Sequence, residues 1–260
     1  MLSPPAGWAV TVVGAVELIA VGFAAGLVSV LVSLASLVSY PALLGMGLLP
    51  VAANVTNTVA LIFTGVGAAA GSRPELAGTR RTVLRLGAVA AVGGAVGAAL
   101  LLIAPASTFQ LVVPFLIGGA SAFLLAQPHL ARRRQRSGDA GKGWRTGLLG
   151  ILLFGAAVYA GYFGAAGGIL IFAIVSAMYP EWSPQRANAV KSVTSMCANG
   201  AAAIGFACYG PVHWVFVAPL ALGFLLGGRV GPVLARRLPS NSLRVIAAGC
   251  GIALAVKFAV

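Results

Sequence analysis

Charged side chains are scarce in this chain of 260 residues, since only 8% of the residues are charged and just four are Asp or Glu. By contrast, 60% are hydrophobic, and the mean hydropathy is +1.00. A soluble domain carries about 25% charged residues, so a soluble fold with a single core is excluded. Long apolar runs follow one another, and a membrane-spanning helix needs about 20 such residues. The composition therefore predicts an all-α, polytopic helical membrane protein.

Residues suited to catalysis or metal binding are also few. The chain has two His and three Cys, with no Cys-x-x-Cys spacing, whereas a metal or hydrolytic site needs several such groups close together. A nucleotide-binding loop requires Gly-Lys followed by Ser or Thr, but Lys142 is followed by Gly143. We therefore expect no enzyme activity, no cofactor and no bound metal.

Positive charge is in excess, and the formal net charge is +13. The Lys and Arg residues gather in short loops between apolar runs, as in the cytoplasmic loops of membrane proteins. This placement favours the lipid bilayer, and not nucleic acid, as the partner of the chain. Three loops carry most of the excess: Arg73, Arg80 and Arg81; Arg132, Arg133, Arg134, Arg136, Lys142 and Arg145; and Arg236 and Arg237.

Two apolar runs, at 8–48 and 147–178, are too long for one span each. Small residues interrupt both of them, SLAS at 33–36 and GAAGG at 164–168. Each run therefore predicts a helical hairpin or broken helix. Three further spans follow each hairpin, at about 54–71, 82–103 and 109–127 in the first half and about 187–208, 213–235 and 242–259 in the second.

The sequence thus divides into a first membrane repeat at 1–127, a cytoplasmic basic linker at 128–146 and a second membrane repeat at 147–260. With the basic loops in the cytoplasm, the number of crossings gives the repeats opposite orientations and places both termini on the non-cytoplasmic side. Such inverted-topology repeats with discontinuous helices are typical of secondary transporters, whose substrate site lies near the midplane between the repeats.

A short polar patch follows each hairpin, where the next apolar run begins. It reads PVAANVTNT at 50–58 and PQRANAVKS at 184–192. Asn54 and Asn188 are 134 residues apart by subtraction of their numbers, and the prolines that begin the two patches keep the same offset. Two matching polar patches inside a membrane protein predict one site built from two halves.

Lys191 is the main candidate for binding an anion. In a helix that begins near residue 187, Lys191 shares adjoining faces with Asn188, Ser192 and Ser195. An ionisable group inside a span is energetically costly, and such groups usually have a function. The alternative is that Lys191 extends to the cytoplasmic interface and anchors the topology.

The matching groups of the first half are neutral: Asn54, Thr56, Asn57 and Thr58, with Asn57 at the position of Lys191. Amides and hydroxyls can donate hydrogen bonds to the oxygens of an anion. Asn54 and Asn188 are equally well explained as N-terminal caps of their helices, and a helix N-terminus itself attracts anions.

The two breaks supply further candidates for substrate binding. Glycine has no Cβ and lets backbone N–H groups face a ligand, although close helix packing explains the same glycines. Asn199, in the middle of a span, either lines the path or bonds a neighbouring helix. The candidates at the breaks are Gly164, Gly167, Gly168, Ser33 and Ser36.

Glu17 is the sole carboxylate that we place well inside a span, because Glu75, Asp139 and Glu181 all fall in loops. It is the one evident candidate for proton coupling. The alternative is a protonated Glu17 that bonds a neighbouring helix.

Together, these features resemble the sulfite exporter TauE/SafE family of membrane transporters. The resemblance rests on VSYPALLGMGLLPVAANVTNTVA in the first half, on GYFGAAGGILIF and RANAVKSVTSMCANGAAAIGF in the second, and on GPVHW with LALGFLLGGRVGPVLARRLP. The chain departs from the family at SLASL, where members often have a glycine-rich break. The resemblance implies export of small sulfur-containing anions, sulfite or organosulfonates, across the cell inner membrane.

The expected partner is therefore a small oxyanion, and a homodimer with a second copy of the chain is also considered. Export would be driven by the proton gradient or by the membrane potential. The rival hypothesis is a non-transporting membrane scaffold or assembly subunit, in which the polar patches are helix-packing contacts.

Overall fold

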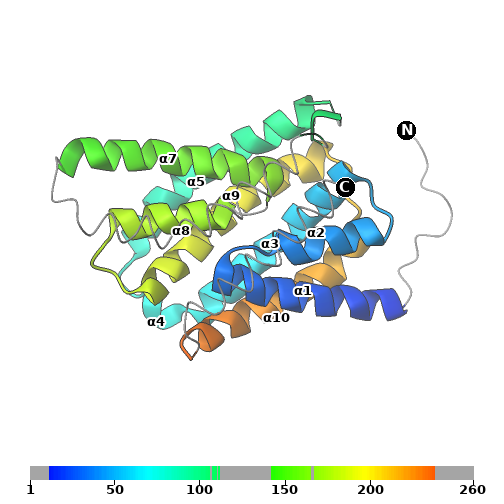
Figure 1. Cartoon of the computed structure of the whole chain (residues 1–260), viewed down its shortest axis with the longest axis horizontal. Helices are drawn as coiled ribbons and strands as arrows, with labels where there is room; N and C mark the ends of the chain where they lie inside the picture. Colours follow the sequence, from blue (N-terminus) through cyan, green and yellow to red (C-terminus); the bar gives the residue numbers. More distant parts are fainter. Residues whose placement is uncertain (1–11, 106, 110, 112–141, 165–166, 238–260) are drawn as a thin grey trace.

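The apolar runs form helices in the computed structural model, which describes residues 12–105, 107–109, 111, 142–164 and 167–237. No strand occurs among these residues, which confirms the all-α class. The elements are labelled in Figure 1: α1 (Val12–Val32), α2 (Ser36–Gly45), α3 (Pro50–Gly71), α4 (Arg73–Leu76), α5 (Arg80–Ile103), α7 (Lys142–Phe163), α8 (Gly167–Met178), α9 (Pro184–Tyr209) and α10 (Trp214–Ala235).

The helices follow the predicted spans closely. α3 and α9 begin at Pro50 and Pro184, a few residues before the predicted starts, because proline suits the first turn of a helix. α7 begins at Lys142, inside the segment predicted as a linker. The rest of that linker, the span predicted at 242–259 and most of the span predicted at 109–127 lie outside the described residues.

Four of the described helices are long and apolar enough to cross a membrane, namely α1, α3, α5 and α10. α9 is longer, at 26 residues, but its polar side chains make it less apolar. Together with the hydropathy of the whole chain, these helices identify a multi-pass membrane protein.

Both predicted hairpins are broken helices with a short second arm. α2 has 10 residues and α8 has 12, so they extend about 15 and 18 Å, roughly half of a hydrocarbon core about 30 Å thick. In Figure 1, α2 folds back beside α1 and α8 folds back beside α7, and the two pairs enter the molecule from opposite ends. The two breaks meet, since Gly168 lies against Ser33.

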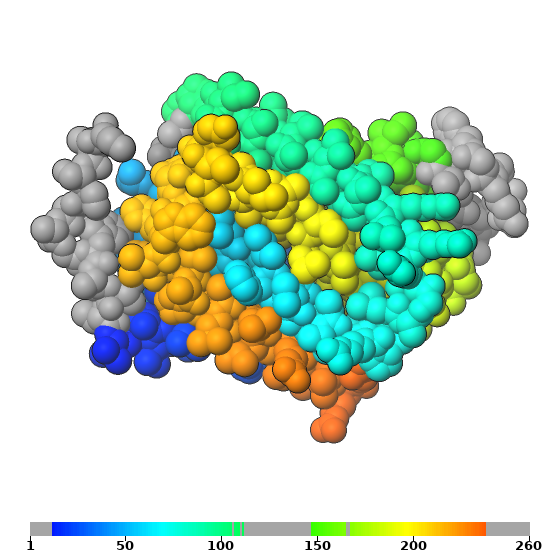
Figure 2. Space-filling view, turned by 180° about the vertical axis from the view of Figure 1, so that it is seen from behind, coloured from blue at the N-terminus to red at the C-terminus, as the bar shows by residue number. Residues whose placement is uncertain are grey.

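The polar helices α3 and α9 pack on each other, and each also packs on a long helix of the other half: α3 on α10, and α9 on α5. α10 packs in turn on α1, and α5 on α7. Figure 2 shows α3 between α10 (orange) and α9 (yellow) on the rear face. In the apolar 18-residue stretch of α3, 78% is buried, a larger share than in the corresponding stretch of α1, α5 or α10. The polar patch on α3 is therefore enclosed by protein.

An ion pair joins the short helix α4 to the end of α10. Arg236 donates from Nε and Nη2 to the two carboxylate oxygens of Glu75, at 2.8 and 2.9 Å, and Nη2 also donates to the Gly71 carbonyl at 3.0 Å. Arg186 donates to the Ala77 carbonyl at 3.1 Å. The end of α3, the start of α9 and the end of α10 therefore lie on the same side, and so do two of the predicted basic loops.

We expect the Glu75–Arg236 ion pair to add a small, pH-dependent contribution to the free energy of unfolding. The Arg236 guanidinium holds the pKa of the Glu75 carboxyl below its ordinary value. Its contribution is therefore present above the ordinary carboxyl pKa of about 4.3 and is lost as the pH falls through the lowered value of the folded protein. Because the pair is partly exposed, Glu75→Gln should cost about 1 kcal/mol or less.

Thermal unfolding in detergent between about pH 3 and pH 7 measures this difference. Glu181→Gln, at an exposed acid, is the control and should behave like the unmodified protein. Equal pH dependence in Glu75→Gln and the unmodified protein would show that the pair adds no stability.

Candidate functional site

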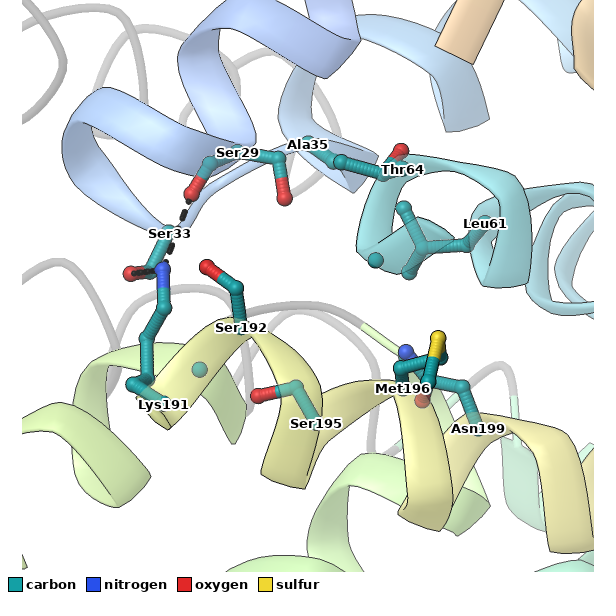
Figure 3. A pocket seen from close by; sticks show the side chains of 13 residues that line it. Ser29, Ser33, Ala35, Leu61, Thr64, Lys191, Ser192, Ser195, Met196 and Asn199 are labelled. Atoms are coloured by element: carbon teal, nitrogen blue, oxygen red, sulfur yellow. Dashed lines mark hydrogen bonds between the residues drawn. The ribbon is translucent and has the colours of Figure 1, made fainter. Parts of the chain in front are cut away.

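A polar pocket lies where the two breaks meet α3 and α9. Its volume is about 40 Å³, room for about three water-sized groups. The residues that line it come from α1 and its break, from α3, from the α7–α8 break and from α9 (Figure 3): Ser29, Ser33, Ala35, Leu61, Thr64, Gly65, Gly164, Gly168, Lys191, Ser192, Ser195, Met196 and Asn199.

Lys191 is the charged side chain among these lining residues, and only 2% of it is exposed. Its Nζ donates to Ser33 Oγ at 2.9 Å and to the Ser29 carbonyl at 3.2 Å (Figure 3). Ser29 lies in the last turn of α1, at the helix end that carries partial negative charge and stabilises a cation, and its carbonyl also accepts from the Ser33 backbone N–H at 2.9 Å. An ammonium has three N–H donors, so these two bonds leave one for another acceptor in the pocket.

Three buried polar atoms on the pocket wall have no hydrogen-bond partner among the described residues. They are Thr64 Oγ1, Ser195 Oγ and Asn199 Oδ1. Most buried polar atoms in proteins are paired, and an unpaired one costs about 1–3 kcal/mol. A polar ligand in the pocket would supply the missing partners, and the hydroxyls of Thr64 and Ser195 can donate to an oxyanion.

Asn54 and Asn188 connect each broken helix to the other half. Asn54 Nδ2 donates to the Tyr162 carbonyl near the end of α7 at 3.0 Å, and Asn188 Nδ2 donates to the Val30 carbonyl near the end of α1 at 2.9 Å. The asparagines are not N-terminal caps, because α3 and α9 begin four residues earlier, at Pro50 and Pro184. They satisfy carbonyls that the interruption of a helix leaves without partners.

Half of the residues predicted for substrate binding line the pocket: Ser33, Gly164, Gly168, Lys191, Ser192, Ser195 and Asn199. The other half lies outside its wall. Besides the two asparagines, Asn57 donates to Ser36 Oγ at 3.0 Å, Thr58 to the Asn54 carbonyl at 2.8 Å, and the His213 backbone N–H to Thr56 Oγ1 at 3.1 Å, while Gly167 packs on Ala160. These residues support the framework of the pocket.

Sequence reasoning missed several lining residues, of which Ser29 and Thr64 are polar. Helical spacing does not identify either of them. Ser29 precedes Ser33 by four residues, but Ser33 lies beyond the end of α1. Thr64 follows Asn57 by seven residues, but Asn57 does not line the pocket.

Glu17, the candidate for proton coupling, is exposed on α1. It precedes Ser29 by twelve residues, or about 18 Å along a helix. The described structure does not bring Glu17 to the pocket.

The profile of the sulfite exporter TauE/SafE family matches residues 18–258, nearly the whole chain. The chain belongs to this family. The resemblance seen in the sequence is therefore confirmed. TauE/SafE proteins are membrane transporters of the sulfite and sulfonate exporter type, and not enzymes. No curated protein and no solved structure matches the chain.

Proposed function

We propose that this TauE/SafE protein is a secondary transporter that exports sulfite or a small organosulfonate, and that the pocket at Lys191 is its anion site. The observation that carries the proposal is a buried lysine with no acidic neighbour among the lining residues, in a pocket with unpaired hydroxyls. A buried cation without a counter-ion is costly, and a bound oxyanion would supply the counter-ion.

The size of the pocket favours small anions. About 40 Å³ holds roughly three water-sized groups, one fewer than the four heavy atoms of sulfite. A longer organosulfonate would fit only if the pocket opened further.

The packing of the helices supports two matching repeats as the framework for alternating access, and the entry of the α1–α2 and α7–α8 pairs from opposite ends (Figure 1) supports their opposite orientation. If α1, α2, α3 and α5 are exchanged for α7, α8, α9 and α10, the packing of α1 on α10 becomes that of α7 on α5, and the packing of α3 on α10 becomes that of α9 on α5. The contact between α3 and α9 maps onto itself. In secondary transporters with such repeats, the substrate site lies at the repeat interface. We place the protein in the inner membrane with both termini on the non-cytoplasmic side.

Efflux from proteoliposomes loaded with labelled sulfite, and in parallel with a labelled organosulfonate, tests the proposal. We expect efflux that is faster than from loaded liposomes without the protein and that responds to an imposed membrane potential. Equal efflux from liposomes with and without the protein, for both anions, would contradict the function.

We expect the membrane potential to drive export and Glu17 to contribute little. Glu17→Gln should export sulfite within about twofold of the unmodified rate, because Glu17 is exposed on α1 and does not line the pocket. The measurement compares efflux under a pH gradient alone with efflux under a potential alone. If Glu17→Gln loses the response to the pH gradient and keeps the response to potential, Glu17 is the proton carrier.

A further inference from the structure

Ser33 adopts a backbone conformation that costs free energy. Its φ is +64°, and among the described residues no other non-glycine residue has a positive φ. Ser33 directly follows the end of α1, a position where glycine is usual because it has no Cβ to collide with the backbone. A serine in this place therefore calls for an explanation beyond the turn itself.

The serine hydroxyl supplies something that glycine cannot. Ser33 Oγ accepts a hydrogen bond from Lys191 Nζ at 2.9 Å, and the Ser29 carbonyl accepts the other, at 3.2 Å. Lys191 is only 2% exposed, and these two bonds are the ones that the described residues make with its ammonium. The hydroxyl thus fixes the lysine head at the wall of the pocket (Figure 3).

The other break shows the contrast. Gly164, with a φ of +23°, directly follows the end of α7 as Ser33 follows the end of α1. A Cβ on Gly164 would lie 2.9 Å from Thr58 Oγ1, so a side chain at this position would collide with Thr58. The position after α1 therefore carries a hydroxyl that bonds Lys191, whereas the matching position after α7 carries no side chain.

We propose that Ser33 is a positioning residue for Lys191. The backbone conformation of Ser33 lowers the stability of the fold, and its hydroxyl holds the Lys191 ammonium in place in the anion site. This inference rests on the proposed function, and in it Ser33 acts through Lys191 without needing to touch the anion. It has a measurable signature: Ser33→Gly and Ser33→Ala should both lose anion affinity, and the glycine variant should be the more stable of the two. A residue that only supports the fold would change the stability and leave the anion affinity unchanged.

The experiment uses Ser33→Gly in the full-length protein purified in detergent. We expect its midpoint of thermal unfolding to lie about 2–4 °C above that of Ser33→Ala, because both variants lose the hydroxyl and only glycine releases the backbone strain. The affinity for sulfite, measured by calorimetric titration, should fall about tenfold because Lys191 loses one of its two partners. Ser33→Ala keeps the strained backbone and loses the hydroxyl, so its affinity should fall without a gain in stability.

Ser39→Ala is the matched control, because Ser39 is a buried serine of α2 whose Oγ donates to the Ala35 carbonyl and which does not line the pocket. It should bind sulfite like the unmodified protein. Unchanged sulfite affinity in Ser33→Gly, or a midpoint of Ser33→Gly no higher than that of Ser33→Ala, would overturn the positioning role. If Lys191→Met binds sulfite normally as well, the proposed anion site itself is wrong. If only Lys191→Met loses binding, the site stands without the role of Ser33.

Discussion

Replacement of Lys191 with methionine is expected to lower the affinity for sulfite by about a hundredfold. The ammonium is the one charged group among the lining residues, and loss of a charge-assisted hydrogen bond in a buried site costs roughly 2–5 kcal/mol. Methionine has a similar length and no charge, so it should fill the same space beside Ser33. Since a buried charge is removed, the protein should unfold at the same temperature or a higher one.

Calorimetric titration with sulfite measures the affinity, and thermal unfolding without ligand checks the fold. Asn57→Ala is the matched variant in the first half, because Asn57 holds the sequence position that corresponds to Lys191. Its amide donates to Ser36 Oγ outside the pocket wall, so its effect should stay within about fivefold. If Asn57→Ala weakens binding more than Lys191→Met does, the second half does not supply the charge for the anion.

Replacement of Gly161 with leucine is expected to prevent stable folding. Gly161 of α7 lies directly against the backbone of Gly94 in α5, and Gly94 in turn lies against the backbone of Ala198 in α9. A side chain at Gly161 has no flexible neighbour that could move aside, so α5 and α7 must separate. Overpacking of this kind costs about 3 kcal/mol or more, a large part of the total stability of a protein.

Gly155→Leu is the control, because Gly155 lies on the same helix with open space around the position of a Cβ. Both substitutions replace glycine with the same good helix former, so only the interhelical contact differs. We expect the Gly155 variant to match the yield and thermal midpoint of the unmodified protein in detergent, and the Gly161 variant to lose both. Equal yields and midpoints would show that α5 and α7 are not in close backbone contact.

Much of the fold could be read from local sequence. Hydropathy gave the spans that became α3, α5 and α10, because the energy of transfer into lipid depends mainly on the composition of each segment. The breaks at SLAS and GAAGG were predicted as well, and α1 ends at Val32 and α7 at Phe163. The sequence also identifies Lys191 as a candidate, because a charge inside an apolar run is costly and this can be seen without knowing which residues surround it in the fold.

The roles of the neutral polar residues could not be read in this way. Asn54 and Asn188 were interpreted as ligand donors or caps, yet their amides bind carbonyls 108 and 158 residues distant in the sequence. Thr64 was not considered, yet its hydroxyl lies unpaired on the pocket wall. A short polar side chain bonds whichever group the crossing of two helices brings near, and periodicity within one helix carries no information about that crossing.

The sequence by itself determined that the chain is a helical membrane protein with two interrupted helices, two matching polar patches and one lysine in the second patch. Only the tertiary structure decided that Lys191 binds the end of α1, that the two breaks meet, and that half of the predicted polar residues support the pocket without lining it. The physical reason is that membrane insertion depends on each segment alone, whereas a binding site depends on contacts between segments. Those contacts are set where glycines let the helices approach.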